Sequence, residues 1–488
     1  MSVPDLMRIG AIQTEMAQDV QTIITDPVVF DQHTCRITLQ NIGFLHSLSR
    51  IAFQVEASAL NDIGGTNPNM TFAAGVGIHS LIDRATLMIG GKTVCEVEDF
   101  SHFMGYKSMF IDNQINKERE SVLSGRIMNH NFVYQNDYSA DSYGLDNGTF
   151  PVVVGAGDDA GMTAPFNASA ASSASATIIT DGIVPKDNLL VRNEPELQIA
   201  LADLFPFLRF NQLPLYMMSE QVSINLVFTS KDDNRRVVRQ GVSGAAQTVD
   251  IKAGSVKLIA DYLTFDGEIM AQYASANAEM NFNYVDYRLS KRTYNGSGAV
   301  PQTKQILNVG GAGRIVNKIF CGMANDNQKH DTILNCYTSQ DPGINASGNN
   351  QILTTNVRYN DEYLYPIDRT NPSIVYHDIV QTETMVPHVT RDEFNSEGGG
   401  AAGGGLSAQR YNGHPVNAST NSGLRGKFFY QAHRLNKNER INSRGIEVET
   451  TYSELPDLGG ALNYTQRIWI ELLRTATLRN GIFDCYYA

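Results

Sequence analysis

The stretch most like a chemical motif is the glycine-rich run Val152–Gly161, with the sequence VVVGAGDDAG. It fits the Gly-x-Gly-x-x-Gly/Ala pattern that holds a dinucleotide pyrophosphate at a helix N-terminus, and the acidic residue Asp181 follows roughly 20 residues later. However, Asp158 and Asp159 would place negative charge beside the pyrophosphate, and the next segment contains Pro165 and a Ser/Ala run with no apolar helical face. We interpret the run as a surface loop that binds no nucleotide.

Metal-binding and nucleophilic patterns are missing from the sequence as well. The ten histidines are dispersed, and there is no His-x-His pair, His-Glu-x-x-His motif, Cys-x-x-Cys pair or Gly-x-Ser-x-Gly elbow. A second glycine-rich run, Gly310–Gly313, is followed by a strand pattern and is interpreted as a turn. The sequence therefore predicts no catalytic residue, no metal site and no cofactor, and a protein that is not an enzyme.

The composition favours a protein whose surface is covered by other protein. The chain has 488 residues, of which 42% are hydrophobic and only 18% charged, below the roughly 25% of an average soluble domain. A low charged fraction is expected where copies of a chain cover one another. The net charge of −13 opposes direct contact with nucleic acid, so no sequence-specific nucleic acid binding is expected.

The cysteines and the N-terminus indicate a protein made in a reducing compartment, without a secretory signal. The five cysteines are odd in number and widely scattered, which predicts free, mostly buried thiols in a reducing compartment. The opening residues MSVPDLMRIG lack a charged segment followed by an apolar core, and no run of 18 apolar residues occurs.

Strand patterns dominate the rest of the chain. In Gln221–Phe228 apolar residues alternate with polar ones, which predicts a half-buried strand with Ile224 inside and Ser223 outside. Residues 467–473 alternate in the same way, with Ile468, Ile470 and Leu472 set against Arg467 and Glu471. Helix patterns are short, at residues 4–20, 100–110 and 268–276. Many strands, few helices and long polar loops predict an all-β fold of sandwiches or jelly rolls.

Two local features stand out as candidates for a structural or assembly role. Gly90 and Gly91 separate two strand patterns and predict a hairpin turn. An apolar lead-in precedes the strand at 221–228, and its residues are Leu213, Pro214, Leu215, Tyr216 and Met217. This lead-in either fills the core of its own domain or packs at a junction between domains or subunits, and the sequence leaves both placements open.

Several segments resemble the double jelly-roll major capsid proteins of large eukaryotic DNA viruses, in the family's order. They are LPLYMMSEQVSINLVF, the Gly-Gly hairpin and following helix LIDRATLMIGGKTVCEVEDFSHFMGYKSMF, LIADYLTFDGEIMAQYA with Asp261, NSRGIEVETTY, and the closing IWIELLRTATLRNGIFDCYYA. The resemblance runs from about residue 30 to the C-terminus, and in length and N-terminus the chain is most similar to virophages and polinton-like viruses.

The resemblance implies two eight-stranded antiparallel jelly rolls in tandem, with short helices and long loops. It implies an N-terminal segment at 1–27, a first jelly roll at 28–270 and a second at 271–488. In this family three chains form a pseudo-hexameric capsomer, and capsomers tile an icosahedral shell around a double-stranded DNA genome. The expected partners are therefore further copies of the chain, neighbouring capsomers, and penton and minor capsid proteins, and an internal membrane beneath the shell is left open.

Two other classes remain as alternatives. One is a glycan-binding β-sandwich of the fibre or lectin type, which exposed Tyr/Trp clusters in one loop would favour; the chain has a single Trp, on a patterned strand. The other is a cupin-type jelly-roll enzyme, which the missing His pair opposes.

Overall fold

A computed structural model of the chain describes the strands and helices of both halves. The described residues are 19–57, 70–71, 76–107, 123–124, 196–230, 238–239, 249–297, 303–325, 354–368, 372–383, 430–435, 439–452 and 461–487. The glycine-rich run at 152–161 lies outside the described residues.

The N-terminal half of the described chain contains two antiparallel sheets that pack face to face. One sheet is formed by β1 (Asp19–Thr25), β13 (Lys257–Thr264), β5 (Arg50–Ala57), β12 (Val249–Ile251), β4 (Phe44–Leu45) and β9 (Glu196–Ala200). The other is formed by β2 (Val29–Phe30), β3 (Thr34–Thr38), β10 (Val222–Phe228), β7 (Ile82–Ile89) and β8 (Lys92–Glu98). A small separate pair is formed by β6 (Met70–Thr71) and β11 (Val238–Arg239). The rings of Phe53 and Phe228, one from each sheet, lie 6.1 Å apart in the core between them.

The C-terminal half repeats this arrangement with longer strands. One sheet is formed by β14 (Glu279–Ser297), β21 (Ala461–Arg479), β16 (Val316–Asn325), β19 (Tyr430–Arg434) and β22 (Ile482–Tyr487). The other is formed by β15 (Thr303–Gly310), β20 (Ile446–Tyr452), β17 (Thr354–Tyr359) and β18 (Glu362–Tyr363). Ile319 and Val448, from the two sheets, belong to one buried cluster. The all-β fold class of two antiparallel jelly rolls is thereby confirmed.

The helices are short and lie around the sheets. They are η2 (Gly77–Leu81), α1 (Phe100–Lys107), α6 (Leu201–Leu204), α7 (Pro206–Phe210), η5 (Leu215–Met217), α8 (Gly267–Ala276) and α9 (Pro372–Glu383). Two of the three predicted helices are confirmed as α1 and α8. The third, at 4–20, is contradicted at its end, because Asp19 and Val20 belong to a strand, and its remaining residues lie outside the described part. No helix in the described ranges has the length and apolar composition needed to cross a membrane.

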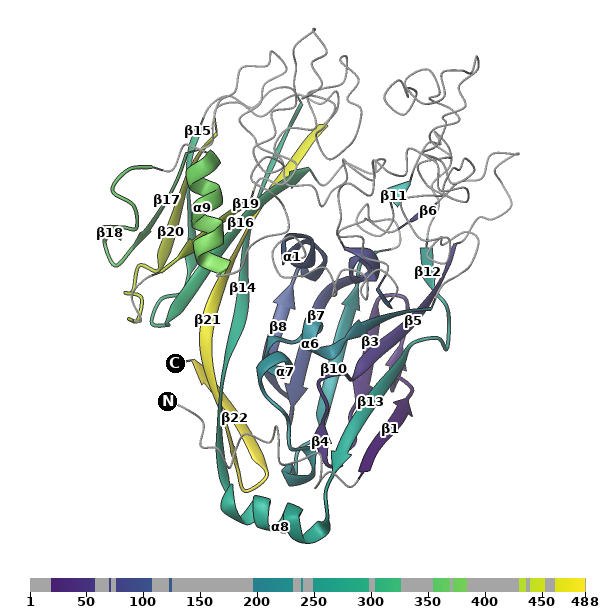
Figure 1. Cartoon of the computed structure of the whole chain (residues 1–488). Helices are drawn as coiled ribbons and strands as arrows, with labels where there is room; N and C mark the ends of the chain where they lie inside the picture. The colour runs from purple at the N-terminus through teal and green to yellow at the C-terminus, as the bar shows by residue number, and fades with distance from the viewer. Residues whose placement is uncertain are drawn as a thin grey trace, which may run out of the picture.

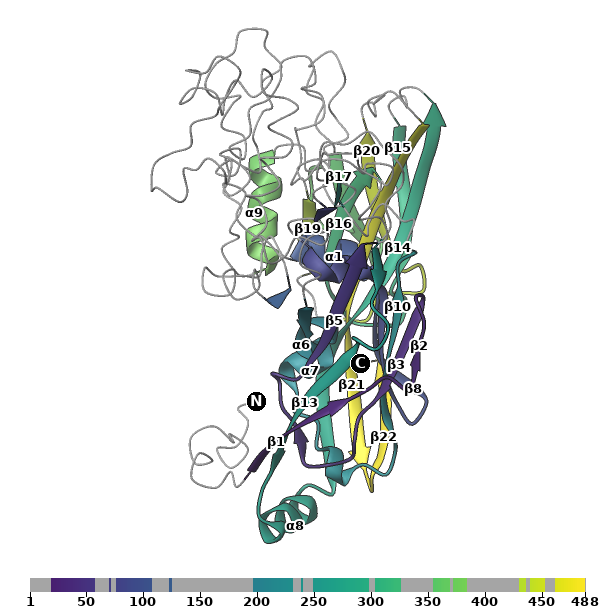
Figure 2. The ribbon, with the colours of Figure 1, turned by 90° about the vertical axis from the view of Figure 1, so that its right-hand side faces the viewer.

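The two halves lie side by side, with β14 and β21 running along the whole length of the molecule (Figure 1). Helix α8 connects the end of β13, in the first half, to the start of β14, in the second, and it lies at the same end of the molecule in both views (Figures 1 and 2). The Asp266 side chain caps α8 by accepting a hydrogen bond from the Glu268 backbone N–H. The predicted domain boundary at residue 270 falls inside this helix and stays a prediction.

Strand β1 lies within the N-terminal segment expected at residues 1–27, a division that stays a prediction. It pairs with β13 along its whole length, from Asp19 opposite Thr264 to Thr25 opposite Leu258. The reason is local: VQTII has the β-branched residues that favour a strand, and β13 offers an unpaired edge to it.

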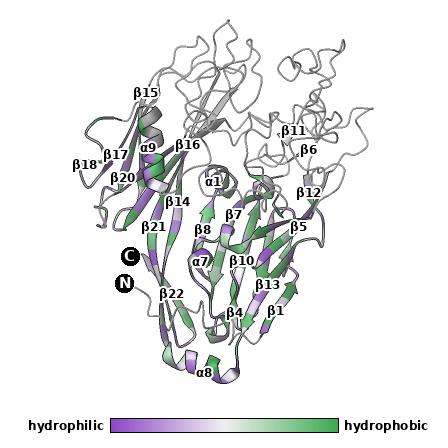
Figure 3. Cartoon of the chain, in the orientation of Figure 1, coloured by the Kyte–Doolittle hydropathy of each residue, from purple (hydrophilic) through white to green (hydrophobic). Residues whose placement is uncertain are grey.

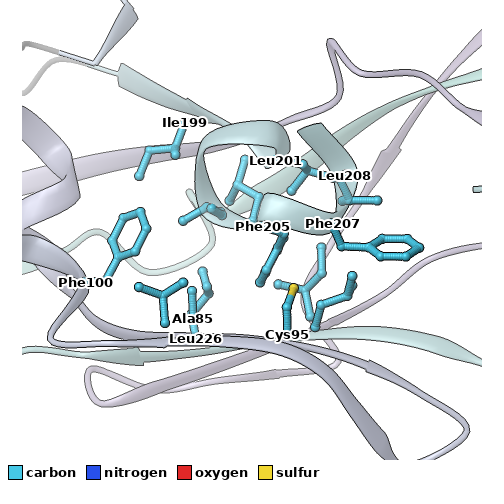
Figure 4. Close-up of a cluster of buried hydrophobic side chains, with 14 of the residues drawn as sticks. Ala85, Cys95, Phe100, Ile199, Leu201, Phe205, Phe207, Leu208 and Leu226 are labelled. Atoms are coloured by element: carbon cyan, nitrogen blue, oxygen red, sulfur yellow. The ribbon is translucent and has the colours of Figure 1, made fainter. Parts of the chain in front are cut away.

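Helices α6 and α7 cover the inner face of the first half's sheet β2-β3-β10-β7-β8. Figure 4 shows Phe205, which lies between these two helices, pointing down toward the strands that carry Cys95 and Leu226, while the ring of Phe207 on α7 extends to the side. All are buried. Colouring by hydropathy shows hydrophobic and hydrophilic residues interleaved along strands such as β13 and β21, as expected of sheets with one face in a core (Figure 3).

Candidate functional site

The two halves meet along strand β8, which is the last strand of its sheet and therefore leaves backbone groups on one edge unpaired. Side chains of the C-terminal half bind these groups. Arg474 Nη1 donates to the Val94 carbonyl at 2.6 Å, and the Tyr284 hydroxyl donates to the same oxygen at 2.8 Å. Trp469 Nε1 donates to the Glu98 carbonyl at 3.3 Å. The second half thus covers the open edge of the first with side chains instead of a further strand.

A buried ion pair holds the middle of this junction. Arg474 Nη1 lies 3.1 Å from Asp286 Oδ2, and the side chains are only 7% and 2% exposed. The other oxygen of Asp286 accepts a hydrogen bond from the Glu96 backbone N–H of β8 at 3.2 Å. Burial raises the pKa of the Asp286 carboxyl, and the charge of Arg474 opposes that rise. Each charge therefore depends on the other to remain in this dry contact.

A second buried ion pair lies at the start of α1. Arg467 Nε donates to Asp99 Oδ2 at 2.7 Å, while the other Asp99 oxygen is 2.6 Å from His102 Nδ1. Asp99 has a positive φ of 50°, which lets the chain turn sharply from β8 into the helix. The carboxylate therefore ties the first turn of α1, in the first half, to strand β21 of the second.

Aromatic side chains fill the space around these charges. The Phe207 ring lies 5.0 Å from Tyr284 and 5.9 Å from Phe483. Nearer α1, the Phe103 ring lies 4.6 Å from that of Tyr287. These residues belong to one buried cluster that includes the core of the first half, whereas the interior of the second half is a separate cluster. The junction is thus an extension of the first core.

Lys107 contributes an uncommon buried cation to the same junction. Its Nζ lies 4.0 Å from the centre of the Phe320 ring, and the rings of Phe103, Tyr106 and Tyr287 are also within 6 Å. The residue is 5% exposed. Its stem and charge thus add to the contact between α1 and β16 through cation–π attraction.

The predicted hairpin turn is present at Gly90 and Gly91. Both have positive φ, 58° and 81°, a conformation that residues without a Cβ atom adopt most readily. A Cβ on Gly90 would also collide with the carboxylate of Glu220. That carboxylate accepts a hydrogen bond from the Phe483 backbone N–H at 2.8 Å, so the turn sits beside the second half.

The apolar lead-in before β10 fills the core of its own half. Leu213 and Leu215 are fully buried there, and Pro214 bridges to Phe44. Tyr216 and Met217 are partly exposed, and the Tyr216 hydroxyl donates to the Met270 carbonyl of α8 at 3.1 Å. The lead-in therefore occupies its own core at one end and reaches the connecting helix at the other.

The chain just after this lead-in touches the second half. The Ser219 backbone N–H donates to the Gly481 carbonyl at 2.9 Å, and the Ser219 hydroxyl donates to the same oxygen at 2.8 Å. Gly481, with φ of 80°, forms the turn between β21 and β22. The lead-in therefore fills the core of its own half, while the chain directly after it lies at the junction between the two halves.

The remaining predicted residues lie away from the junction. Ile224 is fully buried in the first core, as its alternation predicts. Asp261 lies on the outer face of β13 and accepts a hydrogen bond from the Thr22 hydroxyl of β1 at 2.6 Å. The glycine run Gly310–Gly313 forms the expected turn between β15 and β16.

The predicted outward placement of Ser223 on β10 is wrong, and the polar residues of β21 are buried too. Arg467 and Glu471 of β21 are each only 5% exposed, because α1 and neighbouring aromatic residues cover the face that alternation assigns to solvent. Ser223 of β10 is 4% exposed, so that face too is covered at this position. Alternation separates the two faces of a strand but does not reveal whether another part of the chain covers the second one.

The junction charges Asp99, Asp286, Arg467 and Arg474 were not singled out from the sequence. The signal available was a charged residue inside an otherwise apolar strand, as in Tyr284–Asp286 and Trp469–Arg474. Such residues are buried mainly when paired, and the partner of each lies on a segment far away in the chain.

Large apolar side chains remain exposed on the outer strands. On and beside β1 they include Val20, Ile24 and Val28, which are 57%, 63% and 64% exposed. In the second half, Ile306 of β15 and Ile367 after β18 are also exposed. Exposed apolar side chains on an edge strand such as β1 form a surface that folded proteins normally cover.

Comparison with protein families and with curated proteins finds no match. The chain matches no protein-family model. It also matches no curated protein at a significant level.

Comparison with solved structures finds similar folds over almost the whole chain. The crystal structure of the mavirus major capsid protein has 11% sequence identity and a TM-score of 0.56, covering 100% of this chain and 93% of that chain. A chain of the cryo-EM structure of the Sputnik virophage has 13% identity and a TM-score of 0.56, covering 100% and 92%. VP54 of the virus PBCV-1, fitted into a reconstruction of Sputnik, has 12% identity and a TM-score of 0.51, covering 96% and 97%. Together with the paired sheets and the buried junction, these likenesses show that the chain has the double jelly-roll fold of viral major capsid proteins.

Proposed function

We propose that this protein is a viral major capsid protein. It assembles as homotrimers with pseudo-hexameric outline, and these capsomers form an icosahedral shell around a double-stranded DNA genome. The observation that carries the proposal is the fold match, which covers nearly all of this chain and nearly all of each matched chain. Since both jelly rolls are matched in a single chain, the likeness extends beyond one β-sandwich module.

The junction between the halves supports a structural role. A capsomer subunit must keep its two jelly rolls in one fixed relation, because each presents a different surface to its neighbours. Here two buried ion pairs, bonds to the β8 edge and a shared aromatic core join the halves. Such a contact behaves as a core and not as a hinge, since breaking it would leave charges and backbone groups unpaired.

The proposed partners follow from this role. They are further copies of the chain, then neighbouring capsomers, with penton and minor capsid proteins completing the shell and an internal membrane as a further possible neighbour. The protein then resides in the virion. It has no catalytic role and needs no cofactor in this proposal.

Native mass spectrometry and negative-stain electron microscopy of the purified protein test the proposal. Three chains of 53.7 kDa give a trimer of about 161 kDa, and hexagonal particles or closed shells are expected in images. A well-folded monomer as the main species at micromolar concentration would contradict it. In that case a glycan array tests the fibre- or lectin-like alternative, and elemental analysis for a bound metal tests the cupin-type enzyme.

A further inference from the structure

Strand β1 is an edge strand whose outer side is open. It pairs only with β13, and no main-chain group of any other described segment bonds to it. Val20 and Ile24, on its outward face, are 57% and 63% exposed. Thr25 Oγ1, on the opposite face, is buried and has no hydrogen-bond partner in the described part of the chain. An edge of this kind is a template on which a further strand can pair.

The sequence of this strand occurs a second time in the chain. Residues 22–26 are TIITD, and residues 177–181, which lie outside the described part, are TIITD as well. The similarity continues for three residues, since Pro-Val-Val follows the first copy and Gly-Ile-Val follows the second. Isoleucine and threonine are β-branched and favour strands. The second copy therefore carries the same strand-forming residues as β1.

Antiparallel pairing of the two copies places like residues opposite each other. TIIT reads the same in both directions, so Ile178 falls opposite Ile24 and Thr177 falls opposite Thr25. Directly opposed residues share a face of the sheet, so Ile178 would cover the exposed side chain of Ile24. The Thr177 hydroxyl would reach the unpartnered Thr25 Oγ1, since opposed threonines form hydrogen bonds.

Parallel pairing of the same residues is less favourable. It would set Asp181 beside Asp26, and like charges that face each other across two strands destabilise a sheet. In the antiparallel arrangement Asp181 falls opposite Gln21, and Asp26 falls opposite Ala176. The described strand pairs of this sheet are all antiparallel, so the arrangement also continues the pattern of the sheet.

The chain after the second copy is long enough for this pairing within one molecule. The next described residue is Glu196, at the start of β9, and residues 182–195 lie between. Strands β9, β5, β13 and β1 follow one another, so the outer side of β1 lies about 19 Å from β9 across the sheet. The registers add an offset of about 20 Å along the strands, which gives roughly 28 Å in all. Residues 182–195 can span up to about 46 Å.

We propose that residues 177–181 pair with the outer edge of β1 as an additional antiparallel strand of the same chain, with Ile178 opposite Ile24. The added strand gives the open backbone groups of β1 their partners and covers its exposed isoleucine. It thereby closes an edge through which copies of the chain could otherwise associate without specificity. The inference concerns a single chain, so it holds or fails independently of the proposed assembly into capsomers.

Paired cysteines test the register of this contact. Ile24→Cys with Ile178→Cys puts two thiols at directly opposed positions of the outer face, where Cα atoms about 4.5–5.5 Å apart allow a disulfide. Mild oxidation of the folded protein should link most chains internally, as measured by peptide mass spectrometry without reduction. The matched control is Ile24→Cys with Ile179→Cys. It puts the second thiol on the other face of the added strand and should link at least about tenfold less.

Hydrogen exchange gives a second readout that needs no new cysteine. Ile178→Pro removes a backbone donor from the added strand, so the amides of residues 19–25 should exchange about tenfold faster or more than in wild type. The matched control Ala170→Pro lies outside the proposed pairing and should leave their exchange unchanged.

Three results would each overturn the inference. The first is a 24–178 cysteine pair that links no better than the 24–179 pair. The second is linkage between different chains on a non-reducing gel, since the strand would then come from a second copy. The third is exchange in residues 19–25 that Ile178→Pro leaves as in wild type.

Discussion

Arg474 binds several groups of the junction at once. Its guanidinium contacts the Asp286 carboxylate, the carbonyl oxygens of Thr93 and Val94, and the Cys485 sulfur. No other side chain type provides this many donors in a planar, permanently charged group. The residue therefore satisfies both a buried acid and an open strand edge.

The substitution Arg474→Met should destabilise the protein by about 3–5 kcal/mol, because it leaves the Asp286 carboxylate buried without its cation. Urea unfolding followed by the fluorescence of Trp469 measures the change. The matched control is Arg479→Met on the same strand. Arg479 is 72% exposed and 4.0 Å from Glu279, so its loss should cost less than about 1 kcal/mol. Equal losses in the two variants would show that the Arg474 pair contributes no more than a surface pair.

The effect of Arg474→Met should depend on pH. Burial raises the pKa of Asp286, so the folded state binds this proton more tightly than the unfolded state, and the carboxyl favours folding less as the pH rises. Without Arg474 the pKa rises further. The stability lost in the variant should therefore be smaller at about pH 4 than at about pH 7. The urea midpoints of wild type and variant, measured at both pH values, test this. If the stability lost on substitution is the same at both pH values, or larger at about pH 4, the prediction is wrong.

The buried thiols should be unreactive in the folded protein. Burial raises the pKa of Cys35 and of Cys321 to about 12, so at about pH 8 only about one thiol in ten thousand is ionised. Iodoacetamide followed by peptide mass spectrometry should label the half-buried Cys485 well before either of them. In denaturant all three should react alike. Fast labelling of Cys35 or Cys321 in the native protein would show that its strand opens readily.

At the scale of single elements, the two faces of a strand can be tested directly on β10 and its neighbour β3. Ile224→Asp should leave the protein insoluble, since it places a lone carboxylate in the core. Arg36 lies on β3 opposite Asn225 and is exposed, so Arg36→Asp should leave solubility unchanged. Soluble expression and melting temperature measure both, and similar behaviour of the two variants would mean that the register is wrong.

Many of the strands and the Gly90–Gly91 turn follow from local patterns that can be recognised in the sequence. Alternation places Ile224 inside, and the Gly90–Gly91 pair marks a turn that only residues tolerant of positive φ can form. What alternation cannot predict is the cover on the second face. Glu471 alternates as a solvent-facing residue but accepts a hydrogen bond from the Tyr287 hydroxyl in a buried site. That cover comes from residues far away in sequence.

The same limit applies to the junction as a whole. The partner of Asp99 is Arg467, 368 residues further along the chain, and no local pattern connects them. The resemblance to capsid proteins anticipates two jelly rolls side by side, but the charges that join them are a property of the three-dimensional contact. The sequence thus predicts the elements well and their joining residues poorly.

At the scale of the whole molecule, the shared core predicts that the halves unfold together. Phe282, Trp469 and Phe483 of the second half belong to the same buried cluster as the first core. Unfolding either half alone would expose this apolar surface and leave the buried ion pairs broken. Scanning calorimetry should therefore show one transition for the chain. Two well-separated transitions would mean that the junction contributes little to the stability of either half.

The position of the junction residues along the chain also affects how the protein is made. The edge of β8 is covered by Arg474, which lies 380 residues after Val94, and Lys92 of the same hairpin binds the Phe483 carbonyl 391 residues later. At translation rates of about 5–20 residues per second, roughly 20 to 80 seconds pass between the synthesis of β8 and that of its cover. During that time the first jelly roll leaves the ribosome with an open strand edge and an incomplete core. Nascent chains on neighbouring ribosomes then expose the same unpaired edge of β8, through which they can associate. This interval is therefore the stage at which chaperones would most improve the yield of folded protein.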